Sequence, residues 1–204
     1  MRECVVTADR SSKPDRILSA ARQLLVERGH AAVTISEIAR EAGVSRGLLH
    51  YYFESKEHIL AQVVRRNVEQ SIEETSGLLR EAGSREELIQ QFMRAYQEAV
   101  GRGTGYALYF EAFVQGRVHE TVRVELADLF QARRDSLAEA LRAAEERGSI
   151  RLAGDAVGVA SVILALGDGV ALQYLADPDM PILEAGQAVM PLISELLGGT
   201  GAPA

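Results

Sequence analysis

The chain has almost no cysteine, which excludes a disulfide bond within it. Cys4 is the only cysteine among 204 residues, so no second thiol is present to pair with it. A lack of disulfides is typical of reducing compartments. The first twelve residues, MRECVVTADRSS, also lack the apolar run of a secretory signal peptide. We therefore expect a cytoplasmic protein.

The sequence also lacks the short motifs of metal sites and of common catalytic centres. Its four histidines, at positions 30, 50, 58 and 119, are not spaced as metal ligands, and it contains no HExxH or CxxC pattern. We recognise no nucleophile-base pair and no phosphate-binding loop. These absences predict that the protein needs no metal or cofactor and is not an enzyme. Turnover of a bound compound would contradict that prediction.

Positive charge is scarce overall but is not evenly distributed. The net charge is −7, which at first argues against a nucleic-acid partner. Residues 1–66, however, hold 11 lysines and arginines against 8 acidic residues, whereas residues 67–204 hold 11 against 21. An acidic body with a mildly basic end is expected to approach a polyanion end-on, and the small basic excess predicts strongly salt-sensitive binding.

Between Thr34 and Lys56 the sequence has the pattern of two short helices joined by a tight turn. Thr34 and Glu37 have the spacing of a capping box, which marks a helix start. Gly43 can adopt the positive φ that ends a helix, and Ser45 can cap the helix that follows. The stretch therefore predicts a helix-turn-helix.

The second of these short helices has an unusual outward face. Leu48, Leu49 and Tyr52 are expected to point inward. The residues left outside are a cation, a glycine, an imidazole and a phenol: Arg46, Gly47, His50 and Tyr51. Such a set is odd for a solvated surface but suits a groove lined with phosphates.

The pattern GVSRGLLHYYF-x-SKE, residues 43–57, resembles the tetracycline-repressor (TetR) family of bacterial regulators. The match extends upstream to Arg16 and covers roughly the first 60 residues. The resemblance implies an all-α fold, with an N-terminal three-helix helix-turn-helix DNA-binding domain and a C-terminal helical ligand-binding and dimerisation domain, about nine helices in total. It also implies a homodimer that binds a palindromic double-stranded DNA operator and responds to a small-molecule effector.

Carried over residue by residue, the family motif implies a set of DNA contacts in this chain. Lys56 would neutralise a phosphate, and Arg46 would be a candidate for base reading. His50 and Tyr51 are alternatives for the main phosphate contact, while Leu48 is either an apolar base contact or part of the core. The complete predicted set is Thr34, Ser36, Ser45, Arg46, Gly47, His50, Tyr51 and Lys56.

The chain order predicts four segments. Residues 1–12 would form a flexible arm, 13–60 the DNA-binding domain, 61–198 the ligand-binding and dimerisation domain, and 199–204 a flexible tail. A long helix that begins after Ser55 would link the two domains. A lever in that position can change the separation of two DNA-reading heads.

Aromatic residues are few, and six of the eleven lie between positions 92 and 113. Each ring taken singly fits a core. As a set, interrupted by the glycines of GRGTG at 101–105, they favour an apolar cavity for an effector. Arg133 and Arg134 are interpreted as solvated or paired with acids, with a role as counter-charges for an anionic ligand left open. The predicted ligand-binding residues are Phe92, Met93, Tyr96, Tyr106, Tyr109, Phe110, Phe113 and Gln173.

Residues 156–175 carry a single charge, Asp168, and are long enough to span a membrane. An ionisable group near the centre of a span costs roughly 2.5–3.5 kcal/mol, so we expect no membrane insertion. A helix that is apolar on all sides must instead be covered by protein, here by the last helix and a second copy. Asp168 is interpreted as a buried polar group that fixes this packing. The predicted dimer interface comprises Val157, Ser161, Leu164, Asp168, Leu172, Val189, Ile193 and Leu196.

The sequence and its family resemblance thus predict a ligand-responsive, dimeric repressor that a small, largely apolar or aromatic compound releases from its operator. One alternative stays open, a DNA-binding protein of the same fold that is controlled by a protein partner or acts without a small ligand. A collapsed centre without a ligand would favour that alternative.

Overall fold

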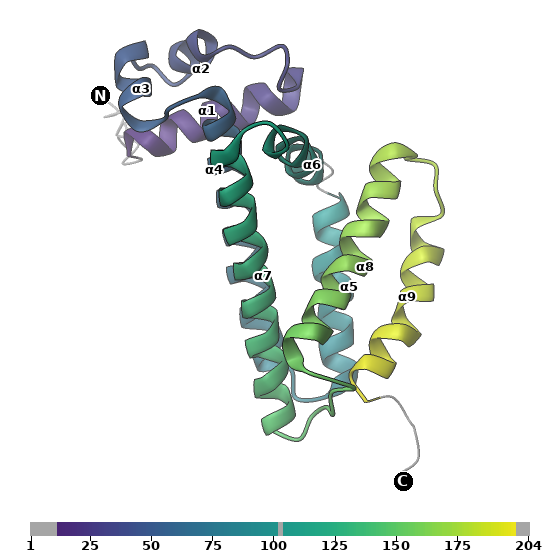
Figure 1. Ribbon diagram of the computed structural model, residues 1–204. Coiled ribbons are helices and arrows are strands. Elements are labelled where there is room, and N and C mark those ends of the chain that lie inside the picture. The colour runs from purple at the N-terminus through teal and green to yellow at the C-terminus, as the bar shows by residue number, and fades with distance from the viewer. Residues whose placement is uncertain (1–11, 102–103, 199–204) are drawn as a thin grey trace, which may run out of the picture. The chain divides into compact units, whose positions relative to one another are not determined.

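The computed structural model describes residues 12–101 and 104–198, and within them all regular secondary structure is α-helical. The helices of this part of the chain are shown in Figure 1. They are α1 (Lys13–Arg28), α2 (Ile35–Glu41), α3 (Arg46–Tyr52), α4 (Lys56–Glu81), α5 (Arg85–Gly101), α6 (Thr104–Gly116), α7 (Glu120–Glu146), α8 (Ala156–Ala176) and α9 (Ile182–Leu196). The predicted all-α fold is confirmed. Cys4, nearly all of the predicted arm and the predicted tail lie outside the described residues.

The chain divides into two compact units, and the boundary between them falls between Val63 and Val64, inside α4. The first unit holds α1, α2, α3 and the start of α4. The second holds the rest of α4 and the helices from α5 to α9. A continuous helix therefore belongs to both units.

The first unit is organised by α1, which packs against α2, while α2 packs against α3. Its core is formed by side chains that are at most 2% exposed, from all four helices and the α1–α2 loop: Ile17, Ala21, Leu25, Val33, Ile38, Ala39, Leu49, Ile59, Leu60 and Val63. Burial of these aliphatic groups is the main force that holds the short helices α2 and α3, because helices of seven residues are unstable alone.

The helix starts in this unit follow the predicted chemistry. Thr34 Oγ1 accepts a hydrogen bond from the Glu37 amide at 3.3 Å, and a Glu37 carboxylate oxygen accepts one from the Thr34 amide at 2.9 Å. Ser45 Oγ accepts from the Leu48 amide at 3.2 Å. The predicted capping box and N-cap are therefore confirmed, and they set where α2 and α3 begin.

In the second unit, α7 packs against α6 and α8, α8 also packs against α9, and α5 packs against α9. Figure 1 shows α8 and α9 as an antiparallel pair joined by a short connection. The core contains Leu79 of α4, Leu88 of α5 and several residues of α7, α8 and α9. Leu141 of α7 and Leu197, just after α9, are fully buried there.

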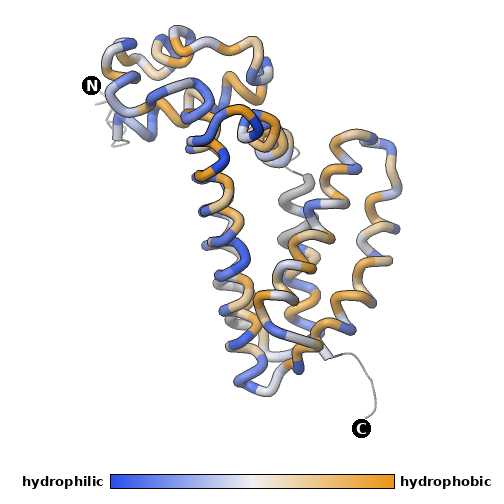
Figure 2. The backbone as a smooth tube through the Cα atoms, in the orientation of Figure 1, coloured by the Kyte–Doolittle hydropathy of each residue, from blue (hydrophilic) through white to orange (hydrophobic). Residues whose placement is uncertain are grey.

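The surface of α8 that faces away from this core is unusually apolar. Figure 2 shows α8 and α9 mostly in the colours of hydrophobic residues. Helix α8 is long and apolar enough to cross a membrane, yet only 28% of its most apolar window is buried within the chain. Five of its exposed positions recur at helical spacing, and we call them the α8 stripe: Gly158, Val162, Ala165, Gly169 and Leu172.

Candidate functional site

The turn between α2 and α3 is held in place by an arginine from α1. Gly43 has a φ of +62°, which glycine adopts readily and other residues rarely adopt. The guanidinium of Arg16 donates a hydrogen bond to the Ala42 carbonyl at 2.6 Å. A Cβ atom on Gly43 would lie only 2.8 Å from that guanidinium. The turn thus depends on both the missing side chain at 43 and the cation at 16.

The predicted DNA-contacting residues of α2 and α3 lie on the exposed surface of the first unit. Tyr51 is 79% exposed. Both His50 and Tyr51 are exposed, so both alternatives for the main phosphate contact remain accessible. The other exposed members of the predicted set are Thr34, Ser36, Ser45, Arg46 and Gly47.

The inward face of α3 differs from the sequence expectation at two positions. Leu49 is fully buried, as expected, but Leu48 is only half-buried and Tyr52 is 36% exposed. The ring of Tyr52 lies edge-on to Tyr51, with ring centroids 5.0 Å apart, and also contacts Phe53. Tyr52 therefore supports the exposed Tyr51 ring instead of filling the core.

Lys56 is the one member of the predicted DNA-contacting set that is half-buried rather than exposed. Its ammonium group donates a hydrogen bond to the backbone carbonyl of His30 at 2.7 Å. His30 lies just after α1 and is 8% exposed, so the contact ties the end of α1 to the start of α4. An ammonium group has three donors, so this bond leaves it able to bind a phosphate as well.

Electrostatics at the start of α2 favour an ionised Glu37. Its hydrogen bonds from Thr34 lower its pKa, and Arg28 and Arg40 contribute to the same shift. Arg28 also forms an ion pair with Glu37 at 3.2 Å. The carboxylate lies in the first turn of α2, where the helix dipole favours negative charge.

The predicted effector residues of α6 form an aromatic cluster in the second unit. We define the aromatic cluster as Tyr106, Tyr109, Phe110 and Phe113 of α6 together with Phe130 of α7. Ring centroids are 5.3 Å apart for Tyr109 and Phe113, and 5.2 Å apart for Phe113 and Phe130. Tyr109 is 3% exposed, whereas Phe113 is 39% exposed. The cluster therefore has a buried centre and an accessible side.

A buried ion pair joins this cluster to α8. Arg133 of α7 donates two hydrogen bonds to the Asp168 carboxylate, each of 3.0 Å, and a third to the Tyr109 hydroxyl at 2.6 Å. The Tyr109 hydroxyl donates to Asp168 at 3.3 Å. The Arg133 and Asp168 side chains are 15% and 17% exposed. Three helices, α6, α7 and α8, thus meet at one charge network.

The aromatic rings also contact the cation directly. The guanidinium carbon of Arg133 lies 5.4 Å from the centroid of Tyr109 and 5.8 Å from that of Phe130, within cation–π distance. Burial raises the pKa of the Tyr109 hydroxyl, which therefore stays protonated. Burial by itself disfavours the charged form of Arg133, but the hydrogen bonds and charge of Asp168 outweigh it and raise the Arg133 pKa.

Sequence reasoning did not identify this pairing. The sequence pattern predicts Arg133 only as solvated or paired with an unspecified acid, places Asp168 in the dimer interface and does not single out Phe130. One signal was available: Asp168 is the only charge in an apolar helix, and a buried carboxylate requires a cationic partner. The sequence alone does not say which of the arginines on α7 supplies it.

The other predicted effector residues are not part of the aromatic cluster. Phe92 of α5 packs against the core of the second unit. Met93 lies against α9, since a Cβ on Gly186 would be 3.2 Å from its terminal methyl carbon. Gln173 is exposed and donates to the Gly169 carbonyl at 3.4 Å. The side chain of Tyr96 lies outside the described part of the chain.

The predicted dimer residues are directed largely toward the chain's own core. Ile193 is 5% exposed and belongs to that core. Val157, Leu164, Val189 and Leu196 pack against it, and Ser161 donates to the backbone of α8. Leu172, at 49% exposure, is the member of the set that lies on the α8 stripe. The outward face of α8 is thus displaced by about one residue from the predicted one.

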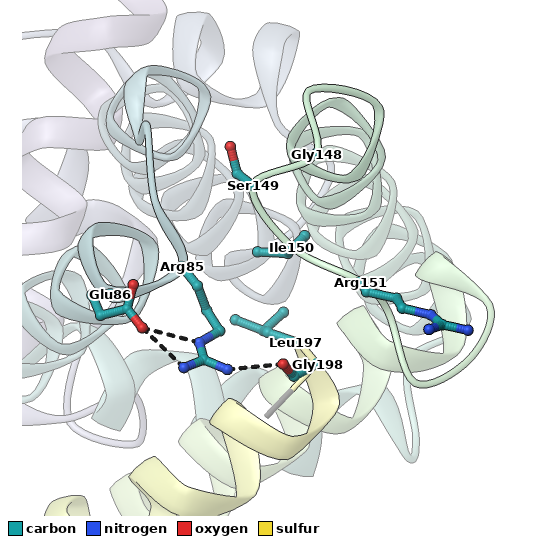
Figure 3. A pocket seen from close by; sticks show the side chains of 8 residues that line it. All are labelled: Arg85, Glu86, Gly148, Ser149, Ile150, Arg151, Leu197 and Gly198. Carbon is teal, nitrogen blue, oxygen red and sulfur yellow. Dashed lines mark hydrogen bonds and ion pairs between the residues drawn. The ribbon is translucent and has the colours of Figure 1, made fainter. Parts of the chain in front are cut away.

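A shallow hollow of about 330 Å³ lies in the second unit, where the segment after α9 meets the start of α5 (Figure 3). Arg85 at the start of α5 donates to the Gly198 carbonyl at 2.8 Å and pairs with Glu86 at 2.9 Å. The bond to Gly198 ties the segment after α9 to α5, so the hollow is explained as an anchoring point. It is lined by Arg85, Glu86, Gly148, Ser149, Ile150, Arg151, Leu197 and Gly198.

Two relatives have names that describe regulatory proteins. A regulator named BetI from Rhizobium meliloti is 49% identical over 49 residues, which is 24% of each chain. A regulator named BetI from Agrobacterium fabrum is 29% identical over 161 residues, covering 78% of this chain and 74% of that one. Both names describe them as helix-turn-helix transcriptional regulators.

The fold also matches solved structures. A protein from Saccharomonospora viridis, solved in complex with choline, superimposes with a TM-score of 0.70 at 24% identity, over 89% of this chain and 95% of that one. At this identity the likeness establishes the fold alone.

Two family models together cover most of the chain. Residues 17–63 match the model for bacterial regulatory proteins of the tetR family, and residues 85–198 match the C-terminal domain of BetI-type transcriptional repressors. The second model alone spans more than half of the sequence. The chain therefore belongs to the TetR family of transcriptional regulators, with a BetI-type C-terminal domain.

Proposed function

We propose that the protein is a cytoplasmic, homodimeric repressor that leaves a palindromic DNA operator when a small effector binds. The observation that carries the proposal is the exposed face of α3, where Arg46, Gly47, His50 and Tyr51 are accessible on a helix fixed by a capped turn. In a dimer, two such helices would enter successive major grooves about 34–36 Å apart. Most contacts would position the protein on phosphates, and Arg46 is the candidate for base reading.

The dimer part of the proposal is supported by the α8 stripe. Its members are apolar or small and exposed, and Leu172 and Val162 are 49% and 47% exposed. Exposed Leu183 and Leu192 on α9 extend the apolar surface. A second copy that packs α8 and α9 against these helices would form a four-helix interface. This interface would also bury the apolar surface of α8, so a membrane would not be needed to cover that surface.

The effector part of the proposal places the ligand at the aromatic cluster. Its accessible side, including Phe113, can accept an apolar or aromatic body. Helix α7 carries both Phe130 of the cluster and Glu125, which pairs with Arg65 of α4 at 2.6 Å. A ligand that favours one position of α7 would thereby act on α4, and only its differential affinity for the two states would drive release.

One experiment tests the proposal as a whole. Purified protein is used to select bound fragments from the genome of its source organism, and compounds from the pathways encoded nearby are then tested for release. We expect fragments that share a palindrome and at least one compound that releases the protein. A shared palindrome without any releasing compound would favour control by a protein partner. Selection of unrelated fragments would contradict operator recognition.

A further inference from the structure

The ion pair within the aromatic cluster leaves part of the Arg133 guanidinium without a hydrogen-bond acceptor. Arginine has five N–H donors in a planar fork. Tyr109 and Asp168 accept three of them, all from the two terminal nitrogens. The Nε–H and the second Nη2–H therefore have no acceptor among the described residues. These two donors are parallel and lie along one side of the guanidinium.

A pair of parallel N–H donors is the geometry that binds a carboxylate through both oxygens. The same two donors act together elsewhere in the chain, because Arg65 Nε and Nη2 both bind one oxygen of the Glu125 carboxylate, at 2.7 and 2.6 Å. We propose that Arg133 recognises a carboxylate on the effector through its Nε and Nη2 donors, while the rest of the effector packs on the aromatic cluster. The proposal rests on the proposed function and specifies the chemical class of the effector.

The aromatic cluster can contact the rest of the effector because its rings are only partly buried. Tyr106 and Phe110 are half-buried, and Phe113 is 39% exposed. The Tyr106 and Phe110 rings stack at an interplanar angle of 25°. An apolar or aromatic body has ring surface available beside the guanidinium, so one molecule can use both features.

A cationic effector fits the same network less well. Its two natural partners would be the Asp168 carboxylate and the faces of Tyr109 and Phe130. Arg133 already lies over both rings at 5.4 and 5.8 Å and pairs with both oxygens of Asp168. A second cation would therefore have to displace Arg133 or lie beside it. A carboxylate needs neither change, because two donors are already available to it.

The proposal is tested with three probes of similar shape, namely phenylacetate, phenylacetamide and benzyltrimethylammonium, by isothermal titration of the full chain. We expect phenylacetate to bind at least about tenfold more tightly than phenylacetamide, because hydrogen bonds between charged groups exceed neutral ones. We expect the ammonium compound to bind more weakly than phenylacetate. Tighter binding of the ammonium compound, equal binding of acid and amide, or no binding of the acid would overturn the proposal.

Two variants assign the effect to Arg133. R133K keeps the charge but loses the fork, so the preference for acid over amide should fall about tenfold. The matched control is R134K, the same change at the next, half-buried residue of α7, which should keep the wild-type preference. D168N keeps the fork and removes a nearby negative charge, so phenylacetate should bind at least as tightly as in the wild type. Loss of phenylacetate binding in D168N, or an unchanged preference in R133K, would contradict the assignment.

The same probes separate this proposal from the proposed function. Each is added to the protein bound to a selected operator fragment. Release by the ammonium compound but not by phenylacetate would leave a ligand-released repressor in place and refute carboxylate recognition. If the protein selects no operator but still shows the acid preference and its loss in R133K, recognition by Arg133 stands and the regulatory function fails.

Discussion

The side chain of Lys56 has one observed contact and one predicted contact. It donates to the His30 carbonyl inside the first unit, and by the family motif it would also neutralise a DNA phosphate. A cation at the first turn of a helix opposes the dipole, so its position has a small cost that the carbonyl contact offsets. Replacing it should therefore affect both folding and DNA binding.

We predict that K56A lowers affinity for all DNA sequences alike and reduces the slope of log K against log salt by about 0.9, the value for one phosphate. Loss of the His30 contact should lower the free energy of unfolding by roughly 0.5–1.5 kcal/mol. Fluorescence anisotropy with specific and random duplexes at several salt concentrations measures the first effect. R142A, which removes an exposed cation from the second unit, should change neither slope nor stability. An unchanged slope in K56A would show that Lys56 touches no phosphate.

Two glycines of the helix-turn-helix should respond in opposite ways to the same substitution. In G43A the new Cβ adopts an unfavourable φ and meets Arg16, so we predict a loss of roughly 1–2 kcal/mol in stability. Gly47 lies within α3 with open space around it, so G47A should be neutral or stabilising by up to about 1 kcal/mol. Thermal unfolding followed by circular dichroism gives both values. Because Gly47 is on the predicted DNA face, G47A should weaken operator binding while the fold is kept. If G47A bound the operator as tightly as the wild type, Gly47 would not be part of the DNA-contacting face.

At the scale of whole helices, the sequence predicts where most elements lie because their ends carry local signals. The caps at Thr34 and Ser45 and the positive φ at Gly43 act within a few residues, so they can be read directly. Ser84 also caps α5, although the Glu87 carboxylate accepts from the Gly83 amide and not from the Ser84 amide, as it would in a full capping box. Such one-residue differences come from loop geometry that no local pattern specifies.

The faces of the helices are harder to predict where the sequence has no polar side to mark them. Helix α8 is apolar all round, so its periodicity does not distinguish inside from outside. For this reason Val157 and Leu164 were predicted at the dimer surface but pack on the chain's own core. The partner of Asp168 was missed for a related reason. Arg133 and Asp168 are far apart in sequence, and their contact depends on how α7 and α8 pack.

Arg65 of α4, just after the boundary between the two units, links α4 to α7. Arg65 binds the Glu125 carboxylate through two nitrogens and lies 3.6 Å from Glu69. Burial disfavours its charge, but the hydrogen bond with Glu125 outweighs this and raises the Arg65 pKa. The two paired side chains are each 25% exposed. This pair is the described contact best placed to pass a movement of α7 to α4.

A double-mutant cycle with R65Q and E125Q should give a coupling of about 1 kcal/mol, reduced from the value for a buried charged hydrogen bond because the pair is partly exposed. Urea denaturation of the four proteins measures it. The exposed pair of Arg123 and Glu120 on α7 is the control, and its R123Q and E120Q cycle should give a smaller coupling. Equal couplings would show that Arg65 and Glu125 form an ordinary surface pair with no special role in joining the helices.

At the scale of the whole molecule, the charge distribution affects how the protein approaches DNA, and the α8 stripe affects whether it associates with a second copy. The acidic second unit should be repelled by DNA, whereas the nearly neutral first unit, with 9 lysines and arginines against 8 acidic residues, should not, which favours end-on binding. The stripe requires a cover, and the proposed second copy would provide one. Together, the charge distribution and the proposed dimer would place two helix-turn-helix units on the same DNA molecule.

We predict that V162E converts the protein from a dimer to a monomer at micromolar concentration, because a carboxylate would be desolvated within an apolar interface. Light scattering after size-exclusion chromatography gives the mass. The control is V118E, the same change at a valine that is 76% exposed and lies outside α8 and α9. It should remain a dimer. A wild-type protein that elutes as a monomer, or a dimeric V162E, would refute the proposed interface.

Glycine and alanine make up three of the five positions of the α8 stripe. Their side chains have no rotamers to lose, whereas ordering a long side chain in an interface costs up to about 2 kcal/mol. Two copies of α8 that close over this stripe would therefore give up little conformational entropy and could bring their backbones unusually near. In such a joint the bulky Val162 and Leu172 would set the register, and each added methyl group at Gly158 or Gly169 would push the paired helices apart.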